Sequence, residues 1–346
     1  MMKGLKIKIF AQGRLFLLMI SGFLIWAACE EADPSQAKKD RAQVLNAPPY
    51  DRLTDSIRSF PNDAGLYFQR AALLSQNNLH DIASADYKRS WELSGDEGIA
   101  LEYASNLILS GNTREAVDLL EKGVKKFPDN AEFSRRLGEA YLHIGAPEKA
   151  LEQYNALIAH DSLNFEAWFD KGSLLARLKD TARAIEALER SFAILPINYS
   201  GLALANLYAA KKDPQTLEVC DILLSKDSSD TQTEPLYLKG MYYAENNQPD
   251  KAIELFDQCI QRDWKMTDAY IEKGIIFFEK KKFDEALKTF TLAATVSNTD
   301  PDAYFWIGRC YESIDDTEKA AVNYERAYAL DRSFTEARDA LKRINR

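Results

Sequence analysis

The clearest pattern of apolar and polar positions lies in Thr267–Phe334, where one arrangement of 34 residues occurs twice in succession. In each copy, apolar residues recur every three to four positions over two stretches, which predicts two amphipathic helices joined by a turn. Small residues recur at the eighth, twentieth and twenty-seventh positions, and bulky residues at the fourth, eleventh and twenty-fourth. A fixed period of this length predicts a stack of similar helix pairs.

The same register extends over most of the chain and defines eight units. Ahead of the first unit, Asp51–Phe60 matches a second helix alone, so we expect a half repeat there. Behind the last unit, Thr335–Arg346 has apolar residues on one side only and predicts the polar-backed capping helix that a stack needs at its end. The residues at the twentieth position are Ala83, Ala116, Ala150, Ala184, Thr216, Ala252, Ala286 and Ala320.

Turn-forming residues agree with this register. Pro147 and Pro249 stand where a second helix begins, and the fixed φ of proline suits a first helical turn. Gly111 and Gly145 fall in the turns within helix pairs, where a missing Cβ permits left-handed backbone angles. Asp300, directly before a proline, is predicted to cap a helix N-terminus.

The fifth unit, Asn198–Leu224, is irregular. Ala205 and Tyr208 take the expected small and bulky positions only if the turn within the helix pair is one residue shorter. The connection that follows, Lys226–Glu234, is longer than its counterparts. It is either a tolerated loop or a functional insert. Its alternating oxygen-bearing residues resemble calcium ligands, but the glycine and the closing acid of a calcium loop are missing, so we favour a plain loop. Those residues are Asp227, Ser229 and Thr231.

The pattern of small and bulky residues resembles the tetratricopeptide repeat. That resemblance implies an all-α solenoid over residues 51–346, a right-handed superhelix of about eight repeats with the half repeat and the cap. In such proteins the first helix of each repeat lines a concave face, and its second, fifth, sixth, ninth and twelfth positions meet a ligand. Carried onto this chain, the resemblance implies ligand contacts at Phe68, Arg135, Arg136, Phe169, Tyr237, Met241, Ile271, Ile275, Phe278, Phe305, Trp306 and Arg309. The alternative for each residue is packing against a neighbouring repeat.

One ligand class of this family is disfavoured by residue type. Members that bind chaperone C-termini clamp a carboxylate with lysine at the fifth and asparagine at the ninth position of one helix. None of the eight units has this pair, and the last has Phe305 and Arg309 instead.

The N-terminus predicts a cell compartment. A basic start is followed by Leu15–Ala28, an apolar run too short to span a bilayer, so residues 1–28 are expected to be a signal peptide. Small residues directly before Cys29 resemble the bacterial lipobox, which implies acylation of this thiol, although Trp26 departs from the motif. The alternative is an uncleaved membrane anchor. Residues 29–50 are polar and predict a flexible tether.

The net charge limits the classes of partner, and the cysteine count bears on disulfide bonding. The formal net charge is −9, which disfavours nucleic acid and anionic membrane surfaces. The acidic start of the tether resembles the signal that sends some Bacteroidota lipoproteins to the cell surface, so surface exposure is a hypothesis. The cysteines beyond the lipobox are Cys220, Cys259 and Cys310. Because their number is odd, we expect small buried side chains rather than disulfides.

No catalytic constellation emerges from the residue types. The three histidines are isolated from one another, and the sequence has no glycine-rich phosphate loop and no nucleophile motif. We therefore expect no enzyme activity, no cofactor and no metal.

These features favour a protein- or peptide-binding scaffold, lipid-anchored in the bacterial cell envelope at the outer membrane, on its periplasmic or surface side. One alternative is a structural subunit of an envelope assembly that makes contacts through its convex side. Another alternative is glycan capture, as in outer-membrane nutrient-binding lipoproteins that contain such repeats. This alternative is weaker, because those proteins carry a large additional insert that this chain lacks.

Overall fold

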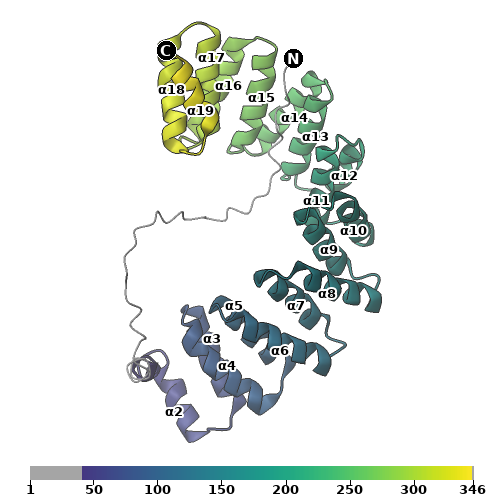
Figure 1. Ribbon diagram of the computed structural model, residues 1–346, viewed down its shortest axis with the longest axis vertical. Helices are drawn as coiled ribbons and strands as arrows, with labels where there is room; N and C mark the ends of the chain where they lie inside the picture. Colours follow the sequence, from purple (N-terminus) through teal and green to yellow (C-terminus); the bar gives the residue numbers. More distant parts are fainter. Residues whose placement is uncertain (1–40, 345–346) are drawn as a thin grey trace. The chain divides into compact units, whose positions relative to one another are not determined.

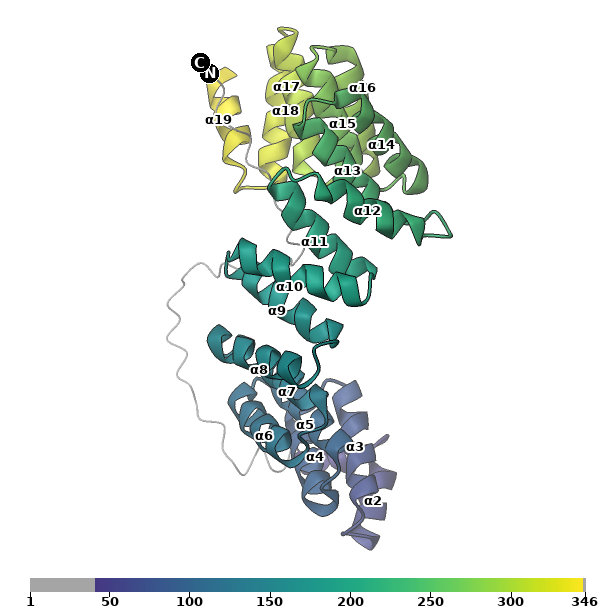
Figure 2. The ribbon, with the colours of Figure 1, turned by 90° about the vertical axis from the view of Figure 1, so that its right-hand side faces the viewer.

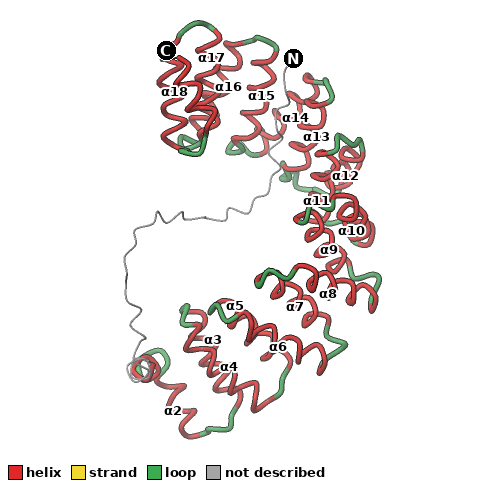
Figure 3. The backbone as a smooth tube through the Cα atoms, viewed as in Figure 1, coloured by secondary structure: helices red, strands yellow, loops and turns green. Residues whose placement is uncertain are grey.

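The computed structural model describes residues 41–344, and within this range the secondary structure consists of helices and turns, with no strand (Figure 3). The all-α prediction is confirmed. The helices form two compact units that meet in sequence between Leu178 and Lys179. We call the described parts, residues 41–178 and 179–344, the N-terminal and the C-terminal unit.

The N-terminal unit contains α2 (Asp51–Ser59), α3 (Ala64–Gln76), α4 (His80–Ser94), α5 (Glu97–Leu109), α6 (Thr113–Lys126), α7 (Ala131–His143), α8 (Pro147–His160) and α9 (Phe165–Arg177). The C-terminal unit contains α10 (Thr181–Ile194), α11 (Asn198–Ala210), α12 (Gln215–Ser225), α13 (Glu234–Glu245), α14 (Pro249–Arg262), α15 (Thr267–Glu279), α16 (Phe283–Val296), α17 (Pro301–Ser313), α18 (Thr317–Leu330) and α19 (Thr335–Ile344).

Within each unit, every helix contacts the next one along the chain, as Figure 1 shows for the helix pairs. In the C-terminal unit the first helices of neighbouring repeats, α11, α13, α15 and α17, also contact one another. This arrangement buries the apolar face of every helix between its neighbours, which is how a stack of short repeats forms a continuous core.

The eighth position of a repeat requires a small residue because the bulky residue at the twenty-fourth position packs against it. A Cβ added to Gly274 would be only 2.5 Å from Cε1 of Phe290, and one added to Gly138 would be 2.6 Å from Cε1 of Tyr154. Both aromatic rings are fully buried. The two positions are therefore complementary, and their pairing explains why the sequence period is so sharp.

The predicted turn chemistry is confirmed. Gly111 and Gly145 have φ angles of 79° and 74°, and Pro147 and Pro249 begin α8 and α14. The carboxylate of Asp300 accepts a hydrogen bond of 3.0 Å from the backbone N–H of Asp302. Local sequence thus determines where these helices begin and end.

The irregular fifth unit follows its predicted register but does not have the predicted shorter turn. Ala205 and Tyr208 are buried at 0% and 3% exposure, in the places of the small and the bulky residue. The connection between α11 and α12 has four residues where the other helix pairs have three, so the turn itself is not shorter. The register is one residue short at the start of α12 instead, where the backbone N–H of Thr216 bonds to the carbonyl of Asp213, only three residues back, at 3.1 Å.

At the C-terminus, α19 lies along α18 and closes the stack (Figure 2). Ala337 and Ala340 are buried, while Arg343 donates to Glu312 of α17 at 2.6 Å. The predicted capping helix is confirmed up to Ile344.

The N-terminal boundary of the folded part needs a correction. Residues 41–45, predicted to belong to the tether, form a helical turn, and Tyr50 is 5% exposed. The carbonyl of Leu45 accepts a 2.6 Å hydrogen bond from Thr54 of α2. Apolar side chains too few to show a period nevertheless pack on the first repeat, so the fold begins before Asp51. The signal peptide, Cys29 and the rest of the tether lie outside the described residues.

A buried ion pair joins the first three helices. Arg70 of α3 donates to the carboxylate of Asp86 of α4 through Nε at 2.6 Å and a terminal nitrogen at 2.8 Å. Its other terminal nitrogen donates to Thr54 of α2 at 2.9 Å. Both charged side chains are less than a tenth exposed. The half repeat is thus connected to the first full repeat by a satisfied polar network.

The cysteines within residues 41–344 are buried and unpaired, as predicted. Burial raises the pKa of all three thiols, Cys220, Cys259 and Cys310, to about 12, so they are protonated at neutral pH. Among residues 41–344, no helix has the length and hydropathy needed to cross a bilayer.

Candidate functional site

The ligand contacts implied in the N-terminal unit are two aromatic residues and two arginines. Phe68 is half-buried and lies edge-on to Tyr87, with ring centroids 6.0 Å apart. Phe169 is also half-buried. The two arginines, Arg135 and Arg136, are both paired with acids of their own unit.

The pairing of these arginines is extensive. Nε of Arg135 lies 3.0 Å from the carboxylate of Asp170, one repeat further on, and a terminal nitrogen lies 3.8 Å from Glu166. Arg136 donates to Glu132 at 2.6 Å and also to Ser105. Burial raises the pKa of Asp170, while the hydrogen bond from Arg135 opposes that rise. These guanidinium groups stabilise the stacking of neighbouring repeats, and a ligand has to compete with these internal carboxylates.

In the C-terminal unit, three implied contacts are core residues. Tyr237, Ile271 and Ile275 are 8%, 7% and 9% exposed. The two isoleucines belong to a cluster with residues of α17, and Tyr237 to one with residues of α15. The first helices contact one another here, so these positions lie inside the stack and do not form an open face. Met241 is half-buried against the same core as Tyr237.

The remaining implied contacts meet at one place. Phe278 of α15 and Phe305, Trp306 and Arg309 of α17 form a half-buried group that we call the Arg309 cluster. The ring centroids of Phe278 and Trp306 are 5.4 Å apart, and those of Phe305 and Trp306 are 5.7 Å apart. The guanidinium carbon of Arg309 lies 5.3 to 6.0 Å from the centroids of all three rings, within the range of cation–π attraction.

A buried and a half-buried aromatic residue pack against the cluster. Phe290 of α16 stacks on Trp306 with centroids 5.6 Å apart and an interplanar angle of 13°. Phe334, just before α19, lies 4.9 Å from Phe305. The positions of both cluster rings are therefore set by packing within the unit.

Arg309 interacts electrostatically with Glu312 of the same helix but forms no ion pair with it. Within residues 41–344, its guanidinium makes no hydrogen bond and no ion pair. The acid one turn further along α17, Glu312, accepts hydrogen bonds from Tyr324 at 2.6 Å and from Arg343 at 2.6 Å. Burial acts to raise the pKa of Glu312, but the hydrogen bonds from Tyr324 and Arg343 and the positive charges of Arg343 and Arg309 hold it below its ordinary value. The donors of Arg309 are consequently available to an external acceptor.

Two further carboxylates, Glu272 and Asp268, lie at ligand-facing positions of α15. Glu272 of α15 is half-buried, and burial, together with the nearby charges of Asp268, Glu245 and Asp302, raises its pKa to about 7. Glu272 and Asp268 occupy the sixth and second positions of their repeat. The positional rule that implied the other contacts identifies these two carboxylates as well.

The long loop in the fifth unit is closed by an arginine. Asp227 accepts hydrogen bonds from Ser229 at 3.1 Å and from the backbone N–H of Gln232 at 2.7 Å. Arg262 of α14 lies 3.4 Å from this carboxylate and 2.5 Å from that of Asp230. A side chain of the protein thus supplies the positive charge in this loop.

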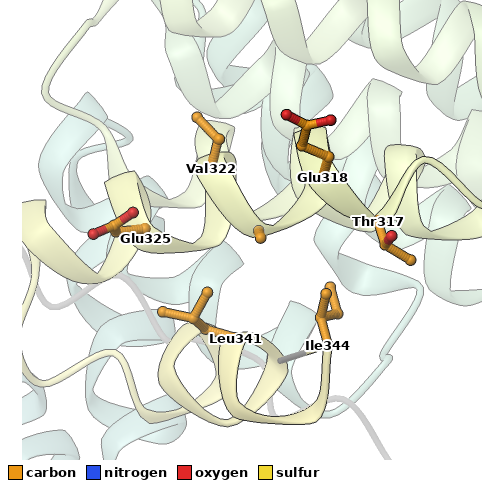
Figure 4. A pocket seen from close by; sticks show the side chains of 7 residues that line it. Thr317, Glu318, Val322, Glu325, Leu341 and Ile344 are labelled. Atoms are coloured by element: carbon orange, nitrogen blue, oxygen red, sulfur yellow. The ribbon is translucent and has the colours of Figure 1, made fainter. Parts of the chain in front are cut away.

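Two open depressions mark the surface. One, of about 460 Å³, lies between α18 and α19, where Leu341 and Ile344 face the side of α18 that carries Val322 (Figure 4). The other, of about 550 Å³, lies beside the turn at Gly111 and the end of α7. In the part of the chain described, no three histidine, cysteine or acidic side chains are grouped so that they could hold a metal ion.

Two curated proteins show what this chain is similar to. Superkiller protein 3 of Schizosaccharomyces pombe is 25% identical over 255 residues, which cover 69% of this chain and 16% of that protein. Hsp70-Hsp90 organizing protein 1 of Glycine max is 25% identical over 198 residues, which cover 56% of this chain and 33% of that protein. The chain thus spans a third or less of the length of these relatives.

Among solved structures, the C-terminal part of a tetratricopeptide repeat protein from Cytophaga hutchinsonii superposes with a TM-score of 0.48 at 17% identity. The match covers 79% of this chain and 99% of that one. Family models described as tetratricopeptide repeat match residues 107–178, 165–196, 237–301 and 301–334, which together exceed half of the chain. The matches to 165–196 and 301–334 each span one pair of consecutive helices, α9 with α10 and α17 with α18, and the chain belongs to the tetratricopeptide repeat family.

Proposed function

We propose that this protein is a non-enzymatic binding protein that holds a peptide segment of a partner protein at the Arg309 cluster. The observation that carries the proposal is the composition and exposure of that cluster: three aromatic rings and an arginine, all half-buried, packed on the buried ring of Phe290 and the half-buried ring of Phe334. Tryptophan, tyrosine and arginine dominate the residues that carry binding energy in protein interfaces.

Rigidity of the cluster favours binding. Trp306 is fixed by Phe290 on one side and by Phe278 and Phe305 on others, so its ring loses little conformational freedom when a ligand arrives. A preorganised surface of this kind lowers the entropic cost of association. Apolar side chains of a peptide would cover the exposed ring edges, and the backbone of the peptide would follow α15 and α17.

Replacing Phe278 by alanine tests the proposal. The probe is an array of random 12-residue peptides, from which the wild-type protein is expected to retain a defined subset. We expect Phe278→Ala to bind that subset about tenfold more weakly, because a truncated anchor costs more than about 1 kcal/mol. Leu292→Ala on α16 is the matched control, since Leu292 is apolar and 47% exposed but lies outside the cluster. Equal loss in both variants, or no retained peptide, would contradict the proposal.

We further propose that the protein is a lipoprotein of the bacterial envelope, tethered through Cys29. The support is the apolar run Leu15–Ala28 followed by the lipobox-like residues. In cells fed a labelled fatty acid, we expect the label to be incorporated and to be lost in Cys29→Ser. Cys220→Ala serves as the control, because that thiol is buried. A label that persists in Cys29→Ser would contradict acylation at this residue.

A further inference from the structure

We propose that the depression between α18 and α19 binds an amphipathic helix of a partner protein, whose lysine or arginine side chains pair with Glu318 and Glu325. The depression measures about 460 Å³, and its lining combines apolar side chains of both helices with these two carboxylates (Figure 4). None of its lining residues belongs to the Arg309 cluster, so the inference concerns a second surface and does not depend on the proposed function.

The apolar side of the depression belongs to α19, which takes the place of a first helix. Within the described residues no second helix follows it. Counted from Thr335, its seventh and tenth positions are Leu341 and Ile344, and both are half-buried. The same positions of α17 are Ile307 and Cys310, which are only 7% and 1% exposed. Apolar surface that is buried in the preceding repeat is therefore partly open in α19.

The apolar residue that α18 contributes interrupts a pattern of charges. Val322 stands at the twenty-second position of its repeat and is 61% exposed. In the six preceding repeats this position is charged, with Asp118, Glu152, Glu186, Glu218, Glu254 and Lys288. An exposed apolar side chain at a position that is otherwise charged is typical of an interaction site.

Glu325 stands at the twenty-fifth position, where the other acids of the C-terminal unit are bonded by the following repeat. Each of these three acids accepts a hydrogen bond from the next first helix. The pairs are Glu189 with Tyr208, Asp221 with Lys239, and Asp257 with Lys273. Both lysines occupy the seventh position, where α19 has Leu341. Within residues 41–344, Glu325 consequently makes no hydrogen bond and no ion pair.

Glu318 has a paired counterpart in α14. At the same eighteenth position, the carboxylate of Asp250 lies 2.5 Å from the ammonium of Lys280 in the next repeat. The charge of Glu318 acts on its neighbour Lys319, but that ammonium donates to Asp316 at 2.6 Å. Both carboxylates of the depression thus lack the basic partner that their counterparts have, which makes the surface complementary to a basic ligand.

The spacing of the two acids specifies the ligand further. Glu318 and Glu325 are seven residues apart, about 10.5 Å along α18, with an apolar residue between them. A helix with basic residues seven positions apart beside an apolar stripe matches this arrangement. The basic residues of α19 do not occupy the acids, because Arg338 and Arg343 are paired elsewhere and Lys342 does not line the depression.

The probe is an array of 18-residue peptides on one helical frame with a leucine stripe. Two flanking positions, seven residues apart, carry lysine, glutamine or glutamate. We expect the full chain to bind the lysine peptides about tenfold more tightly than the glutamate peptides, and Glu318→Lys/Glu325→Lys to reverse that order. Val322→Asp should weaken binding of the lysine peptides about tenfold. Leu292→Asp on α16 is the matched control, because Leu292 is 47% exposed but lies outside the depression.

A preference for lysine that reverses in the doubly substituted variant supports the inference. Equal binding of the lysine and glutamate peptides, an unchanged order in that variant, or no peptide bound would overturn it. Equal effects of Val322→Asp and Leu292→Asp would also overturn it. Sedimentation equilibrium of the protein alone tests the other occupant: a dimer that Val322→Asp dissociates would assign the depression to a second copy of the chain and contradict a partner helix.

Discussion

Replacing Arg70 by methionine is expected to lower the free energy of unfolding of the N-terminal unit by about 3–5 kcal/mol. The substitution leaves the carboxylate of Asp86 buried without its partner, and a buried unpaired charge is among the most destabilising changes a mutation can make. Thr54 also loses its contact with Arg70, so α2 is expected to separate from the first repeat. Hydrogen exchange of the α2–α4 amides measures this loss locally.

Two companion variants make the result specific. Arg58→Met removes an ion pair with Asp55 at 2.7 Å that is more than half exposed on both sides, together with an exposed hydrogen bond to Asn46. Exposed ion pairs contribute less than about 1 kcal/mol. The double variant Arg70→Met/Asp86→Leu removes both buried charges and should regain most of the stability. If Arg70→Met and Arg58→Met have equal effects, the buried network is not what holds the half repeat.

Truncating Phe290 to alanine is expected to destabilise the C-terminal unit by about 3–5 kcal/mol. This ring is fully buried, lies against Gly274 and stacks on Trp306, so its removal leaves a cavity beneath the Arg309 cluster. Urea denaturation followed by circular dichroism gives the change in stability. The affinity for the retained peptides should fall with it, because Trp306 loses its support.

The control for this variant lies on the same helix. Leu292 of α16 is 47% exposed, and Leu292→Ala should change the stability by less than about 0.5 kcal/mol. A Phe290→Ala protein as stable as Leu292→Ala would show that the eighth and twenty-fourth positions do not form the core contact described here.

Most of the fold could be predicted because the small and bulky residues that pack against each other recur at fixed positions of the repeat. The small residue at Gly274 and the bulky one at Phe290 recur at fixed spacing, and the structure brings them into contact. Local turn residues such as Gly111 and Asp300 needed no tertiary information. The segment before Asp51 was misplaced because its few apolar side chains show no period until they meet the first repeat.

The binding surface was harder to predict, because the register within one helix does not show what the next repeat covers. Ile271 and Ile275 occupy the same positions in α15 as Phe305 and Arg309 in α17, yet only the isoleucines are buried. A further first helix, α17, contacts α15, whereas the helices after α17 are its own partner α18 and the cap α19. Position in the array thus decides which of these equivalent side chains remains accessible.

The charges depend on neighbours in the same way. Arg135 was implied as a ligand contact from its position alone, but the sixth position of the following repeat is Asp170, and the two form an ion pair. Comparing the fifth position of each repeat with the sixth of the next would have found this pair in the sequence. After the last repeat, α19 takes the place of a following first helix, and its Arg343 pairs with Glu312 of α17, whereas Arg309 forms no ion pair within the described residues.

The most direct test of a partner-binding Arg309 cluster is photo-cross-linking in cells that produce the full chain, with p-benzoylphenylalanine at position 278 or at position 292. We predict a discrete cross-linked band from position 278 that disappears in an Arg309→Gln background, and none from the equally apolar position 292. Equal patterns from the two positions, or no cross-link from position 278, would contradict the account.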